Sequence, residues 1–282
     1  FRLHAGSRPD LLLAVSDGFG VSASFSYAPL TQPEAYTRRT GATWPQRDVQ
    51  DTRPVVVELA LGDGSGSTRS TRYSYEGLRL DLQGRGSLGF ARRIATETRA
   101  GATLRVEESW RQDFPFTGLP QARVLRQASG RAVVETSWQY AQLTLGSGAA
   151  QRRRPYLSES SERVYEAGGA YDGLHHTTRA YSTAHVDATS GLVLDASWTT
   201  TEHGTGLNAG ASRTQRLWLT GVLNDTANWC LGRPLGAQLT ESHTLAGGSP
   251  LTRSQSLSWD GLRCQLTQHQ AARRVGGQGL AH

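Results

Sequence analysis

The segment with the most recognisable chemical motif in this chain is Gly84–Gly89, which reads GRGSLG. A G-x-G-x-x-G sequence binds a dinucleotide when it follows a strand and opens a helix, because the helix N-terminus then meets the pyrophosphate. Here a strand-like LRLDL precedes the glycines, but the β-like FARRIATET follows them, and no acid is placed to hold a ribose. We therefore expect a glycine-rich turn or bulge that lets two strands approach closely, and no cofactor.

Paired carboxylates are a second source of chemistry, and the chain offers Glu107 with Glu108 and Glu159 with Glu162. A glycosidase needs two carboxylates that face each other across a cleft. With 24 acidic residues in the chain, the sequence singles out none of them as catalytic. Asp63 is the one acid of GDGSGS, which lacks the alternating acids of a calcium loop and predicts a hairpin tip.

The histidines are dispersed, apart from the adjacent pair His175-His176. Neighbouring strand residues point to opposite faces, so a regular strand could not present both of them to one metal ion. We expect solvent-facing loop histidines and no metal site. The full set is His4, His175, His176, His185, His203, His243, His269 and His282.

Two cysteines are present, Cys230 in WCLGRP and Cys264 in LRCQLTQ. They could pair if their strands were neighbours, but two thiols in 282 residues do not make a disulfide framework. The default expectation is therefore two reduced, buried cysteines. They also lack the C-x-x-C or histidine spacing of a zinc site.

The composition favours sheets with one solvent-exposed face, because the apolar fraction of the chain is only 37%. The chain has no methionine and starts at Phe1, so we expect a mature or excised piece of something longer. The net charge is +6, but the arginines are scattered, and the densest run, Arg152–Arg154, predicts a solvated turn. We therefore expect no nucleic-acid partner. The chain contains no apolar run of eighteen residues, so no transmembrane segment is predicted.

Strand signals dominate from end to end, because apolar or aromatic residues recur at every second position. Leu11–Val15 is also expected to be a strand, whereas Ala91–Ala100 lacks the apolar stripe of a helix. Long paired strands imply an extended, ribbon-like antiparallel sheet with few or no helices. The alternating segments are Val55–Leu61, Arg72–Leu80, Thr103–Trp110, Arg131–Leu145, Gly191–Glu202, Arg213–Leu223 and Ser254–Gln268.

Clusters of glycine and small polar residues separate these strands and predict turns. They lie at 62–67, 100–101, 128–130, 146–148, 168–169, 190–191 and 246–248. An aromatic residue followed by an acid or glutamine recurs near several turns, as in Tyr75-Glu76 and Trp259-Asp260, and indicates a decayed hairpin repeat. Such units cannot bury an apolar face alone and must stack with neighbours.

Aromatic residues on exposed sheets could also stack on sugars, and the chain has seven tryptophans and nine tyrosines. The simpler interpretation, which we favour, is that the mid-strand tryptophans line the apolar face of the sheet, away from solvent. The sequence FPF at Phe114–Phe116 is likewise expected to be a packed corner. The tryptophans concerned are Trp110, Trp138, Trp198, Trp218 and Trp259.

Several of these segments, in this order, resemble the RHS/YD-repeat proteins, and most closely the SpvB/Tc-toxin B-component middle region that leads into the RHS repeats. The resemblance thins between Ala149 and Gly210. The segments that carry it are Pro9–Thr31, Arg72–Arg93, Arg111–Pro120, Asn228–Pro234 and Thr252–Gly261. The self-cleaving aspartyl-protease core and the toxin domain of the family have no counterpart here.

The resemblance implies a curved or spiralling antiparallel sheet that forms part of a hollow shell. On that basis, residues 1–148 are an N-terminal β segment and residues 149–282 a continuing hairpin wall, or both are one sheet. The implied function is non-catalytic: a segment of a secreted bacterial toxin shell that encloses a toxin polypeptide and contacts other shell parts or a partner subunit. No catalytic, cofactor or metal residue is predicted. The alternatives are an adhesin or carbohydrate-binding β module and, more weakly, a β-fold hydrolase.

Overall fold

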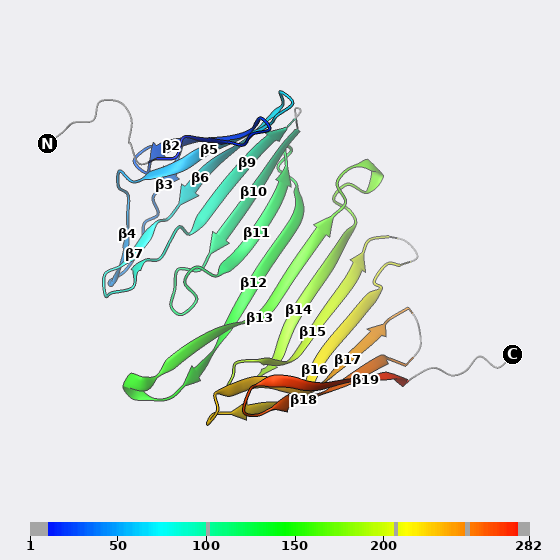
Figure 1. Ribbon diagram of the computed structural model, residues 1–282. Helices are drawn as coiled ribbons and strands as arrows, with labels where there is room; N and C mark the ends of the chain where they lie inside the picture. Colours follow the sequence, from blue (N-terminus) through cyan, green and yellow to red (C-terminus); the bar gives the residue numbers. More distant parts are fainter. Residues whose placement is uncertain (1–10, 100–101, 206–207, 246–248, 276–282) are drawn as a thin grey trace. The chain divides into compact units, whose positions relative to one another are not determined.

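The computed structural model describes residues 11–99, 102–205, 208–245 and 249–275 (Figure 1). Within these ranges the chain is built from long antiparallel strands, which confirms the all-β prediction, and its helical turns are two short 3₁₀ segments. The described residues contain no helix that is long and apolar enough to cross a membrane. The chain forms two compact units, Phe1–Ala132 (unit 1) and Val133–His282 (unit 2). Whether a division falls at residue 148 stays a prediction.

Unit 1 contains a main antiparallel sheet in the order β1-β2-β5-β6-β9-β10-β11. β3 joins β6 in parallel, and a small second sheet has the order β4-β7-β8. The bounds are β1 (Ala14–Ser16), β2 (Val21–Pro29), β3 (Tyr36–Thr37), β4 (Gln46–Asp48), β5 (Pro54–Asp63), β6 (Thr68–Glu76), β7 (Arg79–Asp81), β8 (Gly86–Ser87), β9 (Arg92–Arg99), β10 (Ala102–Trp110) and β11 (Pro120–Gln127).

The single strand predicted over Arg72–Leu80 is wrong, because the chain leaves the main sheet after Glu76 and enters the small sheet at Arg79. Gly77 makes this change of direction with a φ of +66°. A Cβ atom there would lie 2.8 Å from Cδ of Arg39 and 3.0 Å from Cβ of Ala91, so these neighbours would have to shift. Glycine is the residue that tolerates both conditions.

The core of unit 1 lies where the small sheet meets the main one. Leu30, Tyr36 and Leu78 are almost fully buried there, and partly buried Tyr75 and Phe90 pack against them. The Tyr36 hydroxyl donates to the Val49 carbonyl at 2.6 Å and accepts from the Leu78 amide at 2.9 Å. Burial raises the pKa of Tyr36, so the neutral phenol is the form that ties the two sheets together.

Replacing Tyr36 with phenylalanine is expected to lower the free energy of unfolding of unit 1 by about 2 kcal/mol. The substitution leaves the buried Leu78 amide and the Val49 carbonyl without their partner, and unpaired buried groups cost about 1–3 kcal/mol. Urea unfolding measures the change. Tyr27→Phe is the matched control, because the Tyr27 hydroxyl bonds the Leu12 carbonyl at 2.9 Å in an exposed position. Equal losses in the two variants would contradict the prediction.

Unit 2 pairs its strands strictly in chain order, from β12 to β19. Every pairing is antiparallel. The bounds are β12 (Ala132–Leu145), η1 (Gly148–Ala150), β13 (Arg152–Tyr165), η2 (Gly169–Tyr171), β14 (His176–Val186), β15 (Val193–His203), β16 (Ser212–Asp225), β17 (Cys230–His243), β18 (Leu251–Asp260) and β19 (Gln265–Val275).

Two local predictions in unit 2 are corrected. Arg152–Arg154 is not a solvated turn but the start of β13, where Arg152 lies opposite Leu145. The segment Ser254–Gln268 is not one strand, because a turn after Asp260 separates β18 from β19. The Asp260 carboxylate builds that turn by accepting from the amides of Leu262 at 2.9 Å and Arg263 at 3.3 Å.

The remaining turn predictions hold where the structure describes them. Residues 62–67 span the β5–β6 hairpin tip, and turns occur at 146–148, 168–169 and 190–191. The predicted strand at Leu11–Val15 includes part of β1, and Ala91–Ala100 contains β9 rather than a helix. The predicted turns at 100–101 and 246–248 lie outside the described residues.

The mid-strand tryptophans do not line a single apolar face of the sheet. Trp198 lies opposite Gln215, whereas Trp218 lies opposite Asp195, so the two rings are on opposite faces of the same sheet. Their exposed fractions are 41% and 50%. In the described part of unit 2 the buried apolar side chains are few: Val186, Ala196, Cys230 and Ala237. Neither face of this sheet is therefore covered by a core of its own.

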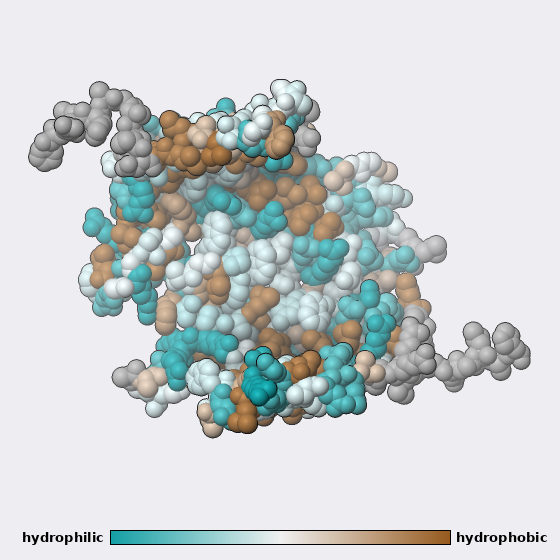
Figure 2. All heavy atoms as spheres, viewed as in Figure 1, coloured by the Kyte–Doolittle hydropathy of each residue, from teal (hydrophilic) through white to brown (hydrophobic). Residues whose placement is uncertain are grey.

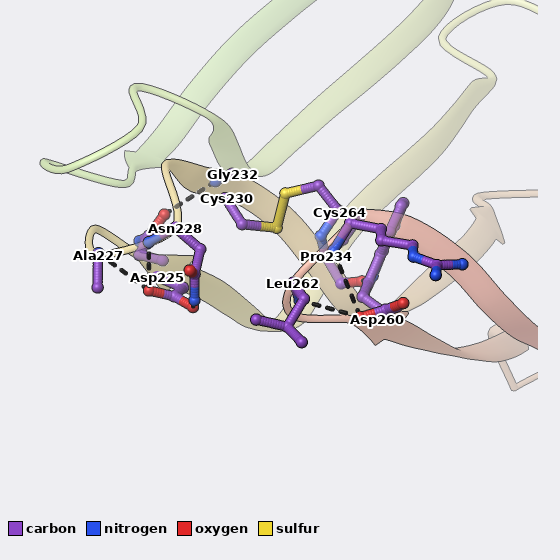
Figure 3. Close-up of a disulfide and its surroundings, with 12 residues drawn as sticks. Asp225, Ala227, Asn228, Cys230, Gly232, Pro234, Asp260, Leu262 and Cys264 are labelled. Atoms are coloured by element: carbon purple, nitrogen blue, oxygen red, sulfur yellow. Dashed lines mark hydrogen bonds between the residues drawn. A yellow bond between two sulfur atoms is a disulfide. The ribbon is translucent and has the colours of Figure 1, made fainter.

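The two cysteines form a disulfide, which corrects the expectation of reduced thiols (Figure 3). Cys230 opens β17 and Cys264 ends the β18–β19 turn, and their Cα atoms are 5.5 Å apart. Because β17 pairs with β18, the start of one lies beside the end of the other. Each turn is also held by an aspartate, Asp225 on one side and Asp260 on the other. The bond thus joins two turns that are already ordered by hydrogen bonds.

Candidate functional site

The GRGSLG motif begins in the turn that follows β7, continues through β8 (Gly86–Ser87) and ends two residues after it. The Asp81 carboxylate shapes it by accepting from the amides of Gln83 at 2.9 Å and Arg85 at 3.4 Å. Gly84 and Gly86 have φ values of +103° and +71°. The chain then continues into β9, so no helix N-terminus follows the glycines. The predicted turn is confirmed.

The two predicted carboxylate pairs are separated by the geometry of their strands. Glu107 and Glu108 are neighbours on β10 and point to opposite faces. Glu159 and Glu162 are three residues apart on β13 and also lie on opposite faces. Glu162 accepts from Arg179 at 2.7 Å. Neither pair therefore flanks a common substrate position.

Glu107 lies at the centre of an arginine cluster on one face of unit 1. Its carboxylate is 2.6 Å from Arg92, 2.9 Å from Arg105 and 3.4 Å from Arg126. Burial alone would raise the pKa of Glu107, but the Arg92 hydrogen bond and the charges of the three arginines outweigh it and hold the pKa below its usual value. Glu107 is therefore a structural anion whose lone pairs and charge are already in use.

The opposite face carries a second charged row, in which Tyr75, Arg93, Glu108 and Arg123 oppose one another across β6, β9, β10 and β11. Arg93 Nη2 donates to Glu108 at 2.5 Å, and Arg123 Nε is 3.8 Å from the same carboxylate. The Arg93 guanidinium carbon is also 5.8 Å from the ring centroids of both Tyr73 and Trp110. Two cations therefore share one anion beside aromatic rings.

A pocket of about 320 Å³ lies beside this row, and we call it the aromatic pocket. The aromatic rings of Tyr75 and Phe90 pack with centroids 4.8 Å apart. The pocket combines residues from β6, β9, β10 and the connections next to them. Its lining is Tyr75, Leu88, Gly89, Phe90, Arg93, Trp110 and Gly118.

The frame of the aromatic pocket is held by hydrogen bonds. Gln112 Nε2 donates to the carbonyls of Gly77 and Gly89, each at 2.7 Å, and so ties the β10–β11 corner to the connections on either side of the small sheet. Arg111 pairs with Asp113 through two nitrogens and lies 4.6 Å from the Phe116 ring centroid. The predicted packed corner at Phe114–Phe116 is thus stabilised by cations, including Arg85 over Phe114 at 3.8 Å.

The adjacent histidines have different surroundings in unit 2. His176 stacks on His203 at 4.4 Å and lies 5.3 Å from Tyr165, whereas His175 stacks on Tyr171 at 4.2 Å. Burial, His203 and Arg163 lower the pKa of His176. These histidines line a pocket of about 690 Å³.

The other histidines are spread over unit 2. His243 Nε2 is 2.8 Å from Glu241; the Arg213 hydrogen bond, with those of His243 and Gln215, lowers the pKa of this glutamate to about 2. Among the residues that the structure describes, no group of histidine, cysteine and acidic side chains is placed to hold a metal ion. His4 and His282 lie outside the described residues.

Sequence reasoning did not single out the aromatic pocket. The alternating pattern predicts that Trp110 lies on the apolar face of the sheet, and it does not distinguish Arg93 from the other arginines. The sequence of the corner gives no signal for it, because Phe114 and Phe116 do not line the pocket. Only the pairing of β6 with β9 and of β9 with β10 brings Tyr75, Arg93 and Trp110 together.

This architecture is similar to that of known proteins. Residues 3–115 match the family model of the insecticide toxin TcdB middle/N-terminal region. No curated protein matches the chain. The crystal structure of TcdB2-TccC3 without its hypervariable C-terminal region is similar, with a TM-score of 0.65 and 11% identity over 90% of this chain. That of TcdB2-TccC3-Cdc42 gives a TM-score of 0.64 and 12% identity over 89%.

A third structure, TcdB2-TccC3, covers 86% of this chain with a TM-score of 0.63 and 12% identity. This chain spans 17% of the length of each of the three solved chains. At such low identity the solved structures establish the fold, whereas the family match covers the N-terminal residues 3–115. Together they confirm that this chain resembles the middle region of a Tc-toxin B component.

Proposed function

We propose that this chain is a non-catalytic wall segment of a shell in a secreted bacterial toxin complex, and that the shell encloses a toxin polypeptide. The resemblance to TcdB2-TccC3 supports the toxin-complex role. The observation that carries the proposal is the open edge of unit 1. Among the described residues, β1 pairs with β2 on one side only, and its neighbourhood exposes large apolar side chains.

Five of the large exposed apolar side chains lie between Leu12 and Val21, and the others are spread over the rest of the described chain. Figure 2 shows hydrophobic residues gathered over the top of the view, where β2 lies in Figure 1. Next to β1, Leu13 and Phe19 are 60% and 91% exposed. An exposed, apolar sheet edge is a template for another strand and is rarely left uncovered in a soluble protein. A shell whose wall continues past β1 would cover it.

Unit 2 supports the same proposal in a different way. Its sheet has few buried apolar side chains and presents tryptophans on both faces. In a shell, one face of the sheet is directed toward the enclosed polypeptide and the other is directed outward, so neither needs a core of its own. A free-standing sugar-binding domain, by contrast, needs a core of its own beneath its binding face.

Protection of the enclosed polypeptide tests the proposal. The protein that carries this chain is produced together with the polypeptide that it would enclose, and the complex is treated with protease. We expect the enclosed polypeptide to survive at least about tenfold longer than the same polypeptide alone. Equal digestion rates, or a stable monomeric chain that binds glycans, would overturn the proposal.

An edge variant links this protection to the wall. The Leu13 carbonyl and the Asp17 amide bond to β2, so the alternation of an antiparallel pair turns the Ala14 amide outward. Ala14→Pro removes that donor and leaves the pairing with β2 in place. We expect it to abolish protection, whereas Ala14→Val, which keeps the donor, retains it. Full protection in the proline variant would show that the wall does not continue past β1.

A further inference from the structure

The aromatic pocket of unit 1 has the features of a binding site that the shell role does not require. We propose that it seats an aromatic side chain that lies next to a carboxylate, on a polypeptide segment outside this chain. The proposal does not rest on the shell function, because the probes described below bind to the chain itself.

The walls of the pocket select a flat apolar group. Three of the seven lining residues are aromatic: Tyr75, Phe90 and Trp110. The volume of about 320 Å³ is at the small end of the range for ligand sites. The Tyr75 hydroxyl donates its proton to the Val56 carbonyl at 2.8 Å, so it cannot donate to a ligand. A single ring therefore suits the pocket better than a polar group.

The charge beside the pocket selects an anion. Arg93 and Arg123 share the single carboxylate of Glu108, which leaves one positive charge in excess in this row. Arg93 Nη2 donates to Glu108, and Nε is buried without a partner, so a ligand can be met only by the terminal nitrogens of this 41% exposed side chain. A planar guanidinium with donors to spare recognises a carboxylate through paired hydrogen bonds.

The rim of the pocket favours a polypeptide over a free small molecule. Gly89 and Gly118 line it with φ values of +77° and +81°, and no atom lies within 4 Å of the position of a Cβ at either residue. Two bare backbone segments with open space above them allow another backbone to approach closely. Gln112 fixes this rim through the Gly77 and Gly89 carbonyls, so the site is formed before the ligand arrives.

The test uses two matched peptides, Ac-Gly-Trp-Glu-Gly-NH₂ and Ac-Gly-Trp-Gln-Gly-NH₂, with binding to the full chain followed by calorimetry and ligand-observed NMR. We expect a dissociation constant on the order of 0.1–1 mM for the glutamate peptide, because it is a small ligand. The glutamine peptide is expected to bind about three- to tenfold more weakly. N-acetyl-tryptophan, tested as a free aromatic acid, is expected to bind more weakly than the glutamate peptide.

The variants locate the preference at Arg93. Arg93→Met is expected to abolish the difference between the two peptides. Arg105→Met is the control, because Arg105 is an ion-paired arginine of the same sheet on the opposite face. If Arg93→Met lowers the melting temperature, Arg93→Lys keeps the charge and is expected to keep part of the preference.

Three results would overturn the proposal: equal binding of the two peptides, an equal effect of Arg105→Met, or tighter binding of free N-acetyl-tryptophan. None of them depends on protease protection. The site and the shell role can therefore fail separately.

Discussion

Removing the disulfide by the double substitution Cys230→Ala and Cys264→Ala is expected to lower the free energy of unfolding of unit 2 by about 3–4 kcal/mol. The bond closes a loop with a sequence separation of 34 residues. In the chain-entropy model a loop of this length restricts the unfolded chain by about that amount. The loss is a large fraction of the stability of an ordinary domain, which is about 5–15 kcal/mol.

Urea unfolding, with hydrogen exchange of the amides in β17 and β18, measures this loss. Cys230 is fully buried, so the alanine variant also loses packing around the sulfur. The wild-type chain treated with a reducing agent is the control, because it keeps both sulfur atoms and loses only the bond. We expect the reduced chain to account for most of the change. A reduced chain as stable as the oxidised one would show that the bond is incidental.

Glu107→Gln is expected to destabilise unit 1 by about 2–3 kcal/mol at pH 7. Glu107 is 15% exposed and holds three arginines, and its replacement leaves those cations without their common anion. Removing one partner of a buried ion pair costs about 3–5 kcal/mol, and partial exposure of the arginines reduces that figure. Urea unfolding of both proteins gives the difference.

The pH dependence gives this prediction a second test. The pKa of Glu107 is lower in the folded state than the value of about 4.3 expected in the unfolded chain. Its contribution is therefore fully present above the unfolded pKa and disappears as the pH falls through the folded pKa. The gap between wild type and variant should shrink between pH 7 and pH 3. Glu108→Gln is the matched control, and because Glu108 meets two arginines rather than three, its loss should be smaller.

The sequence predicts the strands of this protein well where side chains alternate in one phase and poorly where a short turn shifts that phase by one residue. Val55–Leu61 lies within β5, because the period of two reflects local backbone geometry. The break at Gly77 coincides with such a shift, because Tyr73 and Tyr75 lie at odd positions and Leu78 and Leu80 at even ones. A prediction of one strand across Gly77 ignores this change of phase.

The pairing of the strands could not be predicted from the sequence, and most of the candidate site depends on this pairing. Trp198 and Trp218 look equivalent in the sequence, and only the register of β15 with β16 places them on opposite faces. The disulfide likewise needs the start of β17 to lie beside the end of β18. The glycine-rich turn could be predicted because the absence of a following helix is a local property. The aromatic pocket could not, because its residues come from three strands and a corner.

The order in which unit 2 pairs its strands bears on how the protein is made. Each strand from β13 to β19 bonds to the strand just before it in the chain, so every addition meets a template that already exists. Pairing between sequence neighbours requires short loops to close, which keeps the contact order low and folding fast for a β protein. A chain emerging from the ribosome could therefore lengthen its sheet hairpin by hairpin, with a single unpaired edge at any moment. The disulfide joins the start of β17 to the turn that follows β18, so it can form once these two strands are paired and before β19 is added.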